Sequence, residues 1–131
     1  RLLDRALAEA GIERGQCYVT NSVKHFKWTP RGKRRIHQKP DKAEIGACKP
    51  WWKAELALVR PAVLICLGGT AAQAVFDREV RVMAERGKVM ATEFAPRTLI
   101  TLHPSALLRM PDPEEREREY RRFVDDLALA L

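Results

Sequence analysis

The chain has 131 residues, with 24 lysines and arginines against 17 aspartates and glutamates, which gives a formal net charge of +7. The length suits a single domain, and a hydrophobic content of 46% is enough to bury a core, which excludes wholesale disorder. No run of roughly 18 apolar residues occurs, so we expect no membrane span. Three cysteines without paired spacing favour a reducing, cytoplasmic compartment over a disulfide framework.

The first third of the chain combines a helical pattern, a β-rich run and a basic segment. Apolar residues at helical spacing predict a helix over 2–10 that ends at Gly11. A short β-rich run predicts a strand over 17–20, which ends at Asn21. Residues 24–40 hold prolines and a glycine without any periodicity, so we expect an irregular inserted loop there.

The rest of the chain alternates helical and strand-like patterns. Residues 41–59 predict a helix, and Pro50 predicts a kink in it or a join between two helices. Its inward face is expected to consist of Ile45, Cys48, Trp52, Leu56 and Val59. The continuous apolar run 62–67 is typical of a strand that is buried on both faces. The later elements are a short helix over 71–76, a possible strand over 87–92, a second buried strand over 98–102 and a last helix over 114–131.

This alternation predicts one α/β domain over residues 1–131, with three layers (α/β/α) around a central, mostly parallel sheet. In such sheets ligands gather at the carboxyl ends of the strands. Three features follow predicted strands here, namely Asn21, the pair Gly68-Gly69, and His103. Their convergence predicts a site at that edge of the sheet.

The basic segment points to a polyanion. Seven lysines and arginines and no acidic residue lie between residues 24 and 39. When such an excess binds a polyanion, the polyanion is most often nucleic acid, although charge runs in general are more often solvated loops that keep the protein soluble. Phe26, Trp28 and Ile36 add stacking or anchoring groups within the segment, which favours nucleic acid.

Three polar residues could carry chemistry. His103 could donate a hydrogen bond to charge that develops on a leaving group, or it could be a structural turn histidine. The side-chain amide of Asn21 could pair with the imide edge of uracil or thymine, or it could simply form a turn. Cations beside His37 favour its neutral imidazole, which is a competent nucleophile, but the residue could instead contact a phosphate or have no role.

Cys48 and His25 could both bind iron or zinc. However, His25, His37 and Cys48 lack the paired spacing of zinc sites, and the chain contains no C-x₂-C motif. From these residues alone, a buried thiol that packs like a small hydrophobic group is the favoured interpretation of Cys48.

The motifs together resemble the uracil-DNA glycosylase superfamily. The resemblance rests on Tyr18-Val19-Thr20-Asn21, Ala47-Cys48-Lys49-Pro50-Trp51, Leu67-Gly68 and Leu102-His103-Pro104-Ser105. These motifs are similar to those of family 4, the iron–sulfur branch. The stretch Lys33-Arg34-Arg35-Ile36-His37 resembles the signature loop of UdgX-type enzymes. The resemblance covers nearly the whole chain, which would be roughly the C-terminal two-thirds of a family member.

The resemblance implies a function and a role for each matching residue. The protein would excise uracil from DNA: Asn21 would read the flipped-out base, and His103 would stabilise the departing uracil anion. His37 would trap the sugar at C1′ and leave a covalent protein–DNA adduct. The further DNA contacts would be Lys33, Arg34, Arg35, Ser105, Leu107, Leu108 and Arg109.

The resemblance also implies a [4Fe–4S] cluster with Cys48 and His25 as two of its ligands. The other two ligands, together with the family's glycine-rich first motif, would precede Arg1, so we expect the N-terminal part of the domain to be missing. The implied partner is uracil-containing DNA. The protein would act as a monomer and would not associate with a membrane.

Three alternatives stay open at this point. The first is a conventional family 4 glycosylase that releases its product by water attack. The second is a non-catalytic DNA-binding module on the same fold, and the third is a zinc-binding structural domain.

Overall fold

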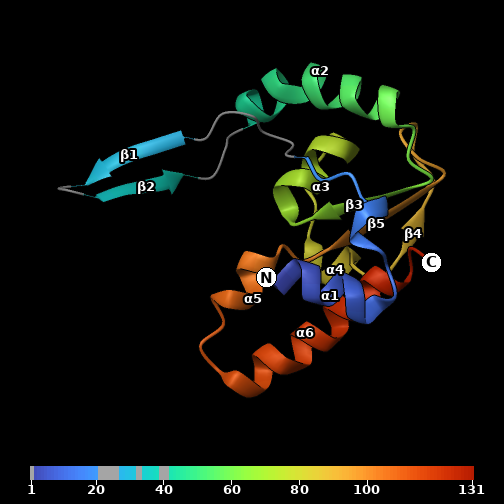
Figure 1. Ribbon diagram of the computed structural model, residues 1–131. Coiled ribbons are helices and arrows are strands. Elements are labelled where there is room, and N and C mark those ends of the chain that lie inside the picture. The colour runs from blue at the N-terminus through green and yellow to red at the C-terminus, as the bar shows by residue number, and fades with distance from the viewer. Residues whose placement is uncertain (1, 21–26, 32–33, 39–41) are drawn as a thin grey trace.

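In the computed structural model, helices cover both faces of a small central sheet (Figure 1). The sheet contains β3 (Val63–Leu67), β5 (Arg97–Thr101) and β4 (Val89–Met90), in the order β3-β5-β4. β3 and β5 run parallel, and the two-residue strand β4 pairs antiparallel with β5. The structure describes residues 2–20, 27–31, 34–38 and 42–131.

One helical layer consists of α1 (Leu2–Ala10) and α6 (Pro113–Ala128), which pack together beneath the sheet. α6 begins where the Asp112 carboxylate accepts the backbone N–H of Glu114 at 3.0 Å, which satisfies one donor of the first turn. Fully buried Phe123 and Leu127 project from α6 into the core. The predicted helices at the two ends of the chain are therefore confirmed.

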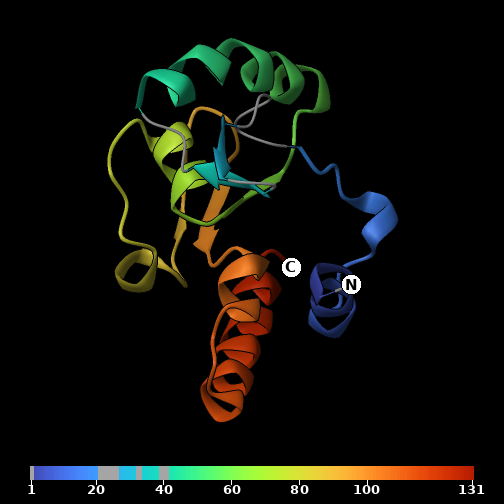
Figure 2. The ribbon, with the colours of Figure 1, turned by 90° about the vertical axis from the view of Figure 1, so that its left-hand side faces the viewer.

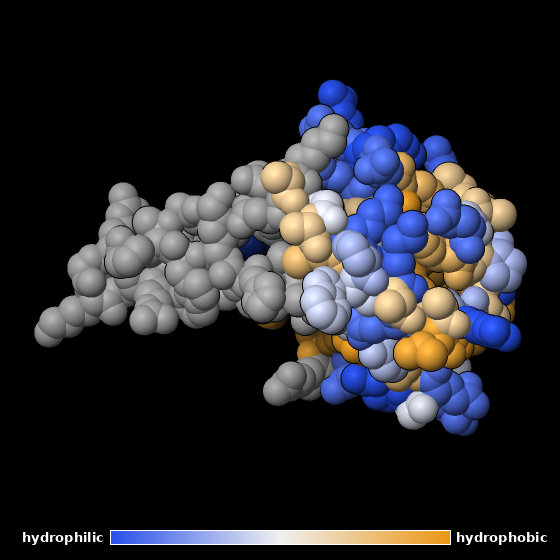
Figure 3. All heavy atoms as spheres, turned by 90° about the horizontal axis from the view of Figure 1, so that it is seen from above, coloured by the Kyte–Doolittle hydropathy of each residue, from blue (hydrophilic) through white to orange (hydrophobic). Residues whose placement is uncertain are grey.

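The opposite layer consists of α2 (Lys42–Val59) and α3 (Gly69–Phe76). Figure 2 shows these two helices on one side of the strands and α6 on the other, so the predicted three-layer α/β/α class is confirmed. The inward face of α2 carries Cys48, Trp52 and Leu56, and Trp52 meets the Phe94 ring edge-on at 5.1 Å between centroids. Seen from above, the molecule mixes hydrophilic and hydrophobic side chains (Figure 3).

Two features of α2 differ from expectation. The helix continues through Pro50 as one element, so of the kink or join expected there, the join between two helices does not occur. Pro50 is exposed, as is Gly46 one turn earlier, so water can reach the carbonyl that loses its helical partner. Val59 was expected to face inward but is 41% exposed, because the helix extends beyond the edge of the core.

None of the described helices is long and apolar enough to cross a membrane.

The strand predicted over 17–20 does not form. The chain instead passes through a short 3₁₀ turn, η1 (Arg14–Gln16), and residues 17–20 follow as an irregular segment. Side chains tie this segment to α2, because the Tyr18 hydroxyl donates to Glu55 at 2.5 Å and the Thr20 hydroxyl lies 2.9 Å from the same carboxylate. The β-rich composition was a misleading signal, since strand preference depends on the pairing that the fold offers.

The described part of the basic segment, residues 27–31 and 34–38, is a hairpin, called the basic hairpin below, rather than part of the irregular loop expected over 24–40. β1 (Lys27–Arg31) pairs antiparallel with β2 (Arg34–Gln38), and Figure 1 shows the pair apart from the central sheet. Pro30 argued against a strand, yet a two-stranded ribbon tolerates proline because each strand has an edge without a partner.

Candidate functional site

The carboxyl ends of β3 and β5 meet at one edge of the sheet. The backbone N–H of Gly68 donates to the carbonyl of Thr101 at 2.8 Å and joins the two strand ends. Gly68 has φ +90° and ψ 171°, a conformation that essentially only glycine adopts. A Cβ at this position would lie 3.1 Å from the Cβ of His103. Two of the three predicted strand-end features are therefore side by side.

His103 forms the N-cap of the short helix α5 (Pro104–Leu108). The backbone N–H of Ser105 donates to Nδ1 of His103 at 3.0 Å, and the Ser105 hydroxyl oxygen lies 2.8 Å from the same nitrogen. A fixed N–H aimed at Nδ1 requires a lone pair there, so the proton of the neutral ring resides on Nε2. The residue is exposed, which leaves the Nε2–H group available to a bound molecule.

The surroundings of this imidazole favour its neutral form. Partial burial of the ring lowers the pKa of His103 below its ordinary value of 6.5, and the positive charge of Arg109 lowers it further. Protonation would also place a hydrogen on Nδ1, opposite the N–H of Ser105, and break the cap. The site thus offers a neutral hydrogen-bond donor at a strand end.

The residues after His103 divide between core and surface. Leu108 is 67% exposed and Arg109 is exposed beside it, whereas Leu107 is fully buried in the cluster between α1 and α6. Ser105 is partly buried beneath His103. Leu107 was expected to contact DNA together with Leu108, but its side chain packs in the core, so of the two leucines only Leu108 presents its side chain at the surface.

Among the remaining predicted DNA-binding and nucleophilic residues, Arg34, Arg35 and His37 lie on the basic hairpin. In its register His37 is opposite Trp28, and Arg35 is opposite Pro30. Arg34 pairs with Arg31 at the end of the basic hairpin. The predicted residues Asn21, His25 and Lys33 lie outside the described residues.

The described residues do not fit an iron–sulfur cluster by themselves. Cys48 is 6% exposed and packs in a cluster with Trp52, Leu56 and Ala74. Within the part of the chain that the structure describes, no three His, Cys, Asp or Glu side chains are grouped so that they could hold a metal ion. A [4Fe–4S] cluster takes four thiolate ligands, and the described residues do not bring such a set together.

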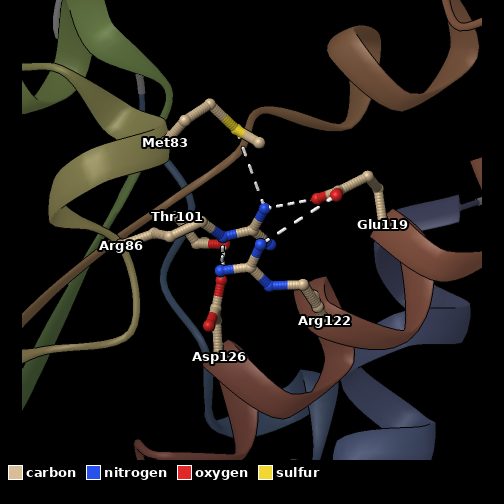
Figure 4. Close-up of polar contacts among 6 residues, drawn as sticks. All are labelled: Met83, Arg86, Thr101, Glu119, Arg122 and Asp126. Atoms are coloured by element: carbon tan, nitrogen blue, oxygen red, sulfur yellow. Dashed lines mark hydrogen bonds and ion pairs between the residues drawn. The ribbon is translucent and has the colours of Figure 1, made fainter. Parts of the chain in front are cut away.

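The sequence analysis did not predict a buried ionic network that lies next to the site. Arg86, which follows the short helix α4 (Val82–Glu85), donates from Nε to Asp126 at 2.8 Å and from Nη1 to Glu119 at 2.6 Å. The hydroxyl of Thr101 donates to the same oxygen of Asp126 at 2.7 Å. Figure 4 shows the Arg86 guanidinium between the two carboxylates. No local sequence pattern predicts these contacts, since 40 residues separate Arg86 from Asp126.

The chain matches the model of a known protein family over nearly its whole length. The family model of the uracil DNA glycosylase superfamily matches residues 1–128. The chain belongs to this superfamily, and its fold is the one expected from the resemblance.

Several similar curated proteins are type-4 uracil-DNA glycosylases. The chain is 32% identical over 124 residues to a type-4 uracil-DNA glycosylase of Thermotoga maritima, which covers 94% of the chain and 58% of that protein. It is 31% identical over 131 residues to the type-4 enzyme of Archaeoglobus fulgidus, with 94% and 62% covered. The type-4 enzyme of Pyrobaculum aerophilum is 30% identical over 118 residues, with 85% and 57% covered. The chain thus spans 57% to 62% of the length of these relatives.

Proposed function

We propose that the protein is a uracil-DNA glycosylase and that this chain contributes the group that stabilises the departing base. The observation that carries the proposal is the imidazole of His103 at the carboxyl end of β5, with Nδ1 bound by the N–H of Ser105 at 3.0 Å. That bond leaves Nε2–H as a donor beside the joined strand ends. The names and the similarity of the type-4 relatives support the same activity.

The proposed reaction breaks the bond between C1′ of the sugar and N1 of uracil. Both electrons of that bond leave with the base, so the sugar becomes cationic and negative charge spreads over the uracil ring. A hydrogen bond from Nε2–H of His103 to a uracil oxygen strengthens as this charge develops, and it therefore lowers the barrier. We propose that Asn21 pairs with the uracil edge, and that Leu108 and Arg109 contact the DNA around the flipped-out nucleotide.

The test is single-turnover release of uracil from an oligonucleotide by the full-length protein and by His103→Ala. Loss of one such donor typically lowers the chemical step by about 10²–10³-fold, or about 2.7–4 kcal/mol. Binding to DNA without uracil should stay unchanged. If the full-length protein binds DNA with and without uracil equally and releases no base, it is a non-catalytic DNA-binding module. An unchanged rate in His103→Ala would remove His103 from the reaction.

We further propose that His37 captures the abasic sugar covalently. The support is the sequence resemblance of residues 33–37 to the UdgX-type loop, together with the basic hairpin that carries it. The lone pair of a neutral imidazole nitrogen would bond to the cationic C1′. The imidazolium formed would then lose its other ring proton, and the uracil anion would gain one, so that charge and atoms balance. The names of the type-4 relatives agree at least as well with conventional release by water attack.

A denaturing gel separates these two outcomes. Covalent capture predicts a protein–DNA band that survives heat and detergent, and His37→Ala should abolish this band while uracil release continues. Water can enter the space that the imidazole vacates, so the variant should leave abasic sites. A wild-type protein that releases uracil without any stable band is a conventional glycosylase. A stable band in His37→Ala would identify another residue as the nucleophile.

A further inference from the structure

The buried network around Arg86 lies directly behind the strand that presents His103. Thr101 is the last residue of β5, and it is completely buried. Its hydroxyl donates to Asp126 at 2.7 Å, and its carbonyl accepts the N–H of Gly68 at 2.8 Å. The end of β5 is therefore anchored through a side chain to α6 and through the backbone to the end of β3. His103 follows two residues later.

The carboxylate that holds Thr101 is itself fixed in place. Asp126 accepts from both Arg86 and Thr101 through the same oxygen, and the Arg86 side chain is only 1% exposed. Glu119 binds the other end of the guanidinium at 2.6 Å. Figure 4 shows Thr101 and Arg86 converging on Asp126 from the strand and from the α4 turn. The hydroxyl of Thr101 thus has a single rigid acceptor.

Stability alone does not explain why these ionic groups are buried here. A buried ion pair brings little net stability, because removing the charges from water offsets their attraction, and apolar residues of similar volume often serve equally well. The surrounding cluster between α1 and α6 already supplies apolar packing around Phe123 and Leu127. What the network adds is direction, since hydrogen bonds fix an orientation that apolar contacts leave loose.

We propose that Thr101, held by Asp126 and Arg86, is a positioning residue that fixes His103 against the departing base. The inference rests on the proposed function. Thr101 touches no substrate; it acts by fixing the backbone from which His103 and its Ser105 cap begin. Small misplacement of a catalytic group lowers the chemical step far more than it lowers binding. Loss of the Thr101 hydroxyl should therefore slow base release and leave DNA affinity unchanged.

The chain offers a matched set of variants on one strand. Thr101→Val keeps the shape of the side chain and removes the hydroxyl, whereas Thr101→Ser keeps the hydroxyl. Thr98 lies on the same strand, is equally buried, and shares a hydrogen bond of 2.8 Å with Thr92 on the other side of the sheet. Thr98→Val therefore makes the same chemical change at the same depth without touching the anchor of His103.

The first experiment measures single-turnover uracil release and DNA affinity for the full-length protein and each variant. Thr101→Val should slow release by about tenfold to a hundredfold with unchanged affinity. Thr101→Ser and Thr98→Val should stay close to wild type. The proposal is overturned if Thr101→Val keeps the wild-type rate, if Thr101→Ser loses as much as Thr101→Val, or if Thr98→Val slows release equally. Thr101→Ala replaces Thr101→Val if the latter does not fold.

The second experiment needs no activity. Ring ¹⁵N and ¹³C signals of His103, assigned by comparison with His103→Ala, report its tautomer and its titration in the protein without DNA. Thr101→Val should shift these signals, and Thr98→Val should not. Unchanged ring signals in Thr101→Val would overturn the positioning role, even if the wild-type protein releases no uracil and the proposed function itself fails.

Discussion

Removal of the buried guanidinium should cost more stability than any surface change in this chain. Arg86→Ala leaves the carboxylates of Asp126 and Glu119, which accept from Arg86 at 2.8 and 2.6 Å, without their shared buried cation. The side chains of Asp126 and Glu119 are only 10% and 16% exposed, so water compensates poorly for the loss. Breaking such a pair from one side typically lowers the free energy of unfolding by about 3–5 kcal/mol.

For a domain of this size, each kcal/mol lowers Tm by about 3–5 °C, so we expect a fall of about 10–25 °C. Thermal unfolding followed by circular dichroism measures Tm, and urea unfolding measures the free energy. The control is Arg121→Ala on the outer face of α6, where the pair with Glu117 at 3.3 Å is 76% and 55% exposed. That pair should contribute about 0.5 kcal/mol or less. Equal losses in the two variants would show that burial does not set the strength of the Arg86 network.

Three further perturbations test the site itself. Gly68→Ala should lower the free energy of unfolding by about 1–3 kcal/mol, because φ +90° strains any other residue and the new Cβ would press on His103. The variant should also release uracil more slowly. A wild-type rate together with a wild-type Tm would contradict the close approach of Gly68 and His103. Replacing Arg34 and Arg35 together by alanine should flatten the salt dependence of DNA binding, since each phosphate contact contributes a slope of about −0.9 in log K against log salt. An unchanged slope would show that the basic hairpin does not contact DNA. As the pH falls, the rate of uracil release should reach half its plateau value only below pH 6.5, because partial burial and the charge of Arg109 lower the pKa of His103 below its ordinary value. A half-maximal rate above pH 6.5 would refute this protonation state.

Local patterns were enough to predict most of the fold. The helix at Leu2–Ala10 and the strand at Val63–Leu67 came directly from apolar spacing and from a continuous apolar run. The approach of Gly68 to His103 also followed, because parallel strands end at the same edge of a sheet. These features depend on a few neighbouring residues, or on one rule of topology.

The errors arose where distant partners decide the outcome. Residues 17–20 have strand composition, but Glu55 on α2 binds Tyr18 and Thr20 and holds them outside the sheet. The tautomer of His103 depends on the backbone N–H of Ser105, which takes its direction only once α5 has formed. Spacing along the chain records neither kind of contact.

Positive charge near the site is expected to act on DNA and on His103 together. Arg109 contributes to the lowered pKa of His103 and is also a proposed contact with DNA. A DNA phosphate bound at Arg109 would neutralise part of that charge, and the pKa of His103 should then rise toward its ordinary value. The fixed N–H of Ser105 opposes this rise, because it needs the unprotonated Nδ1. We therefore expect the cap to favour the neutral imidazole even when a bound phosphate weakens the electrostatic contribution of Arg109.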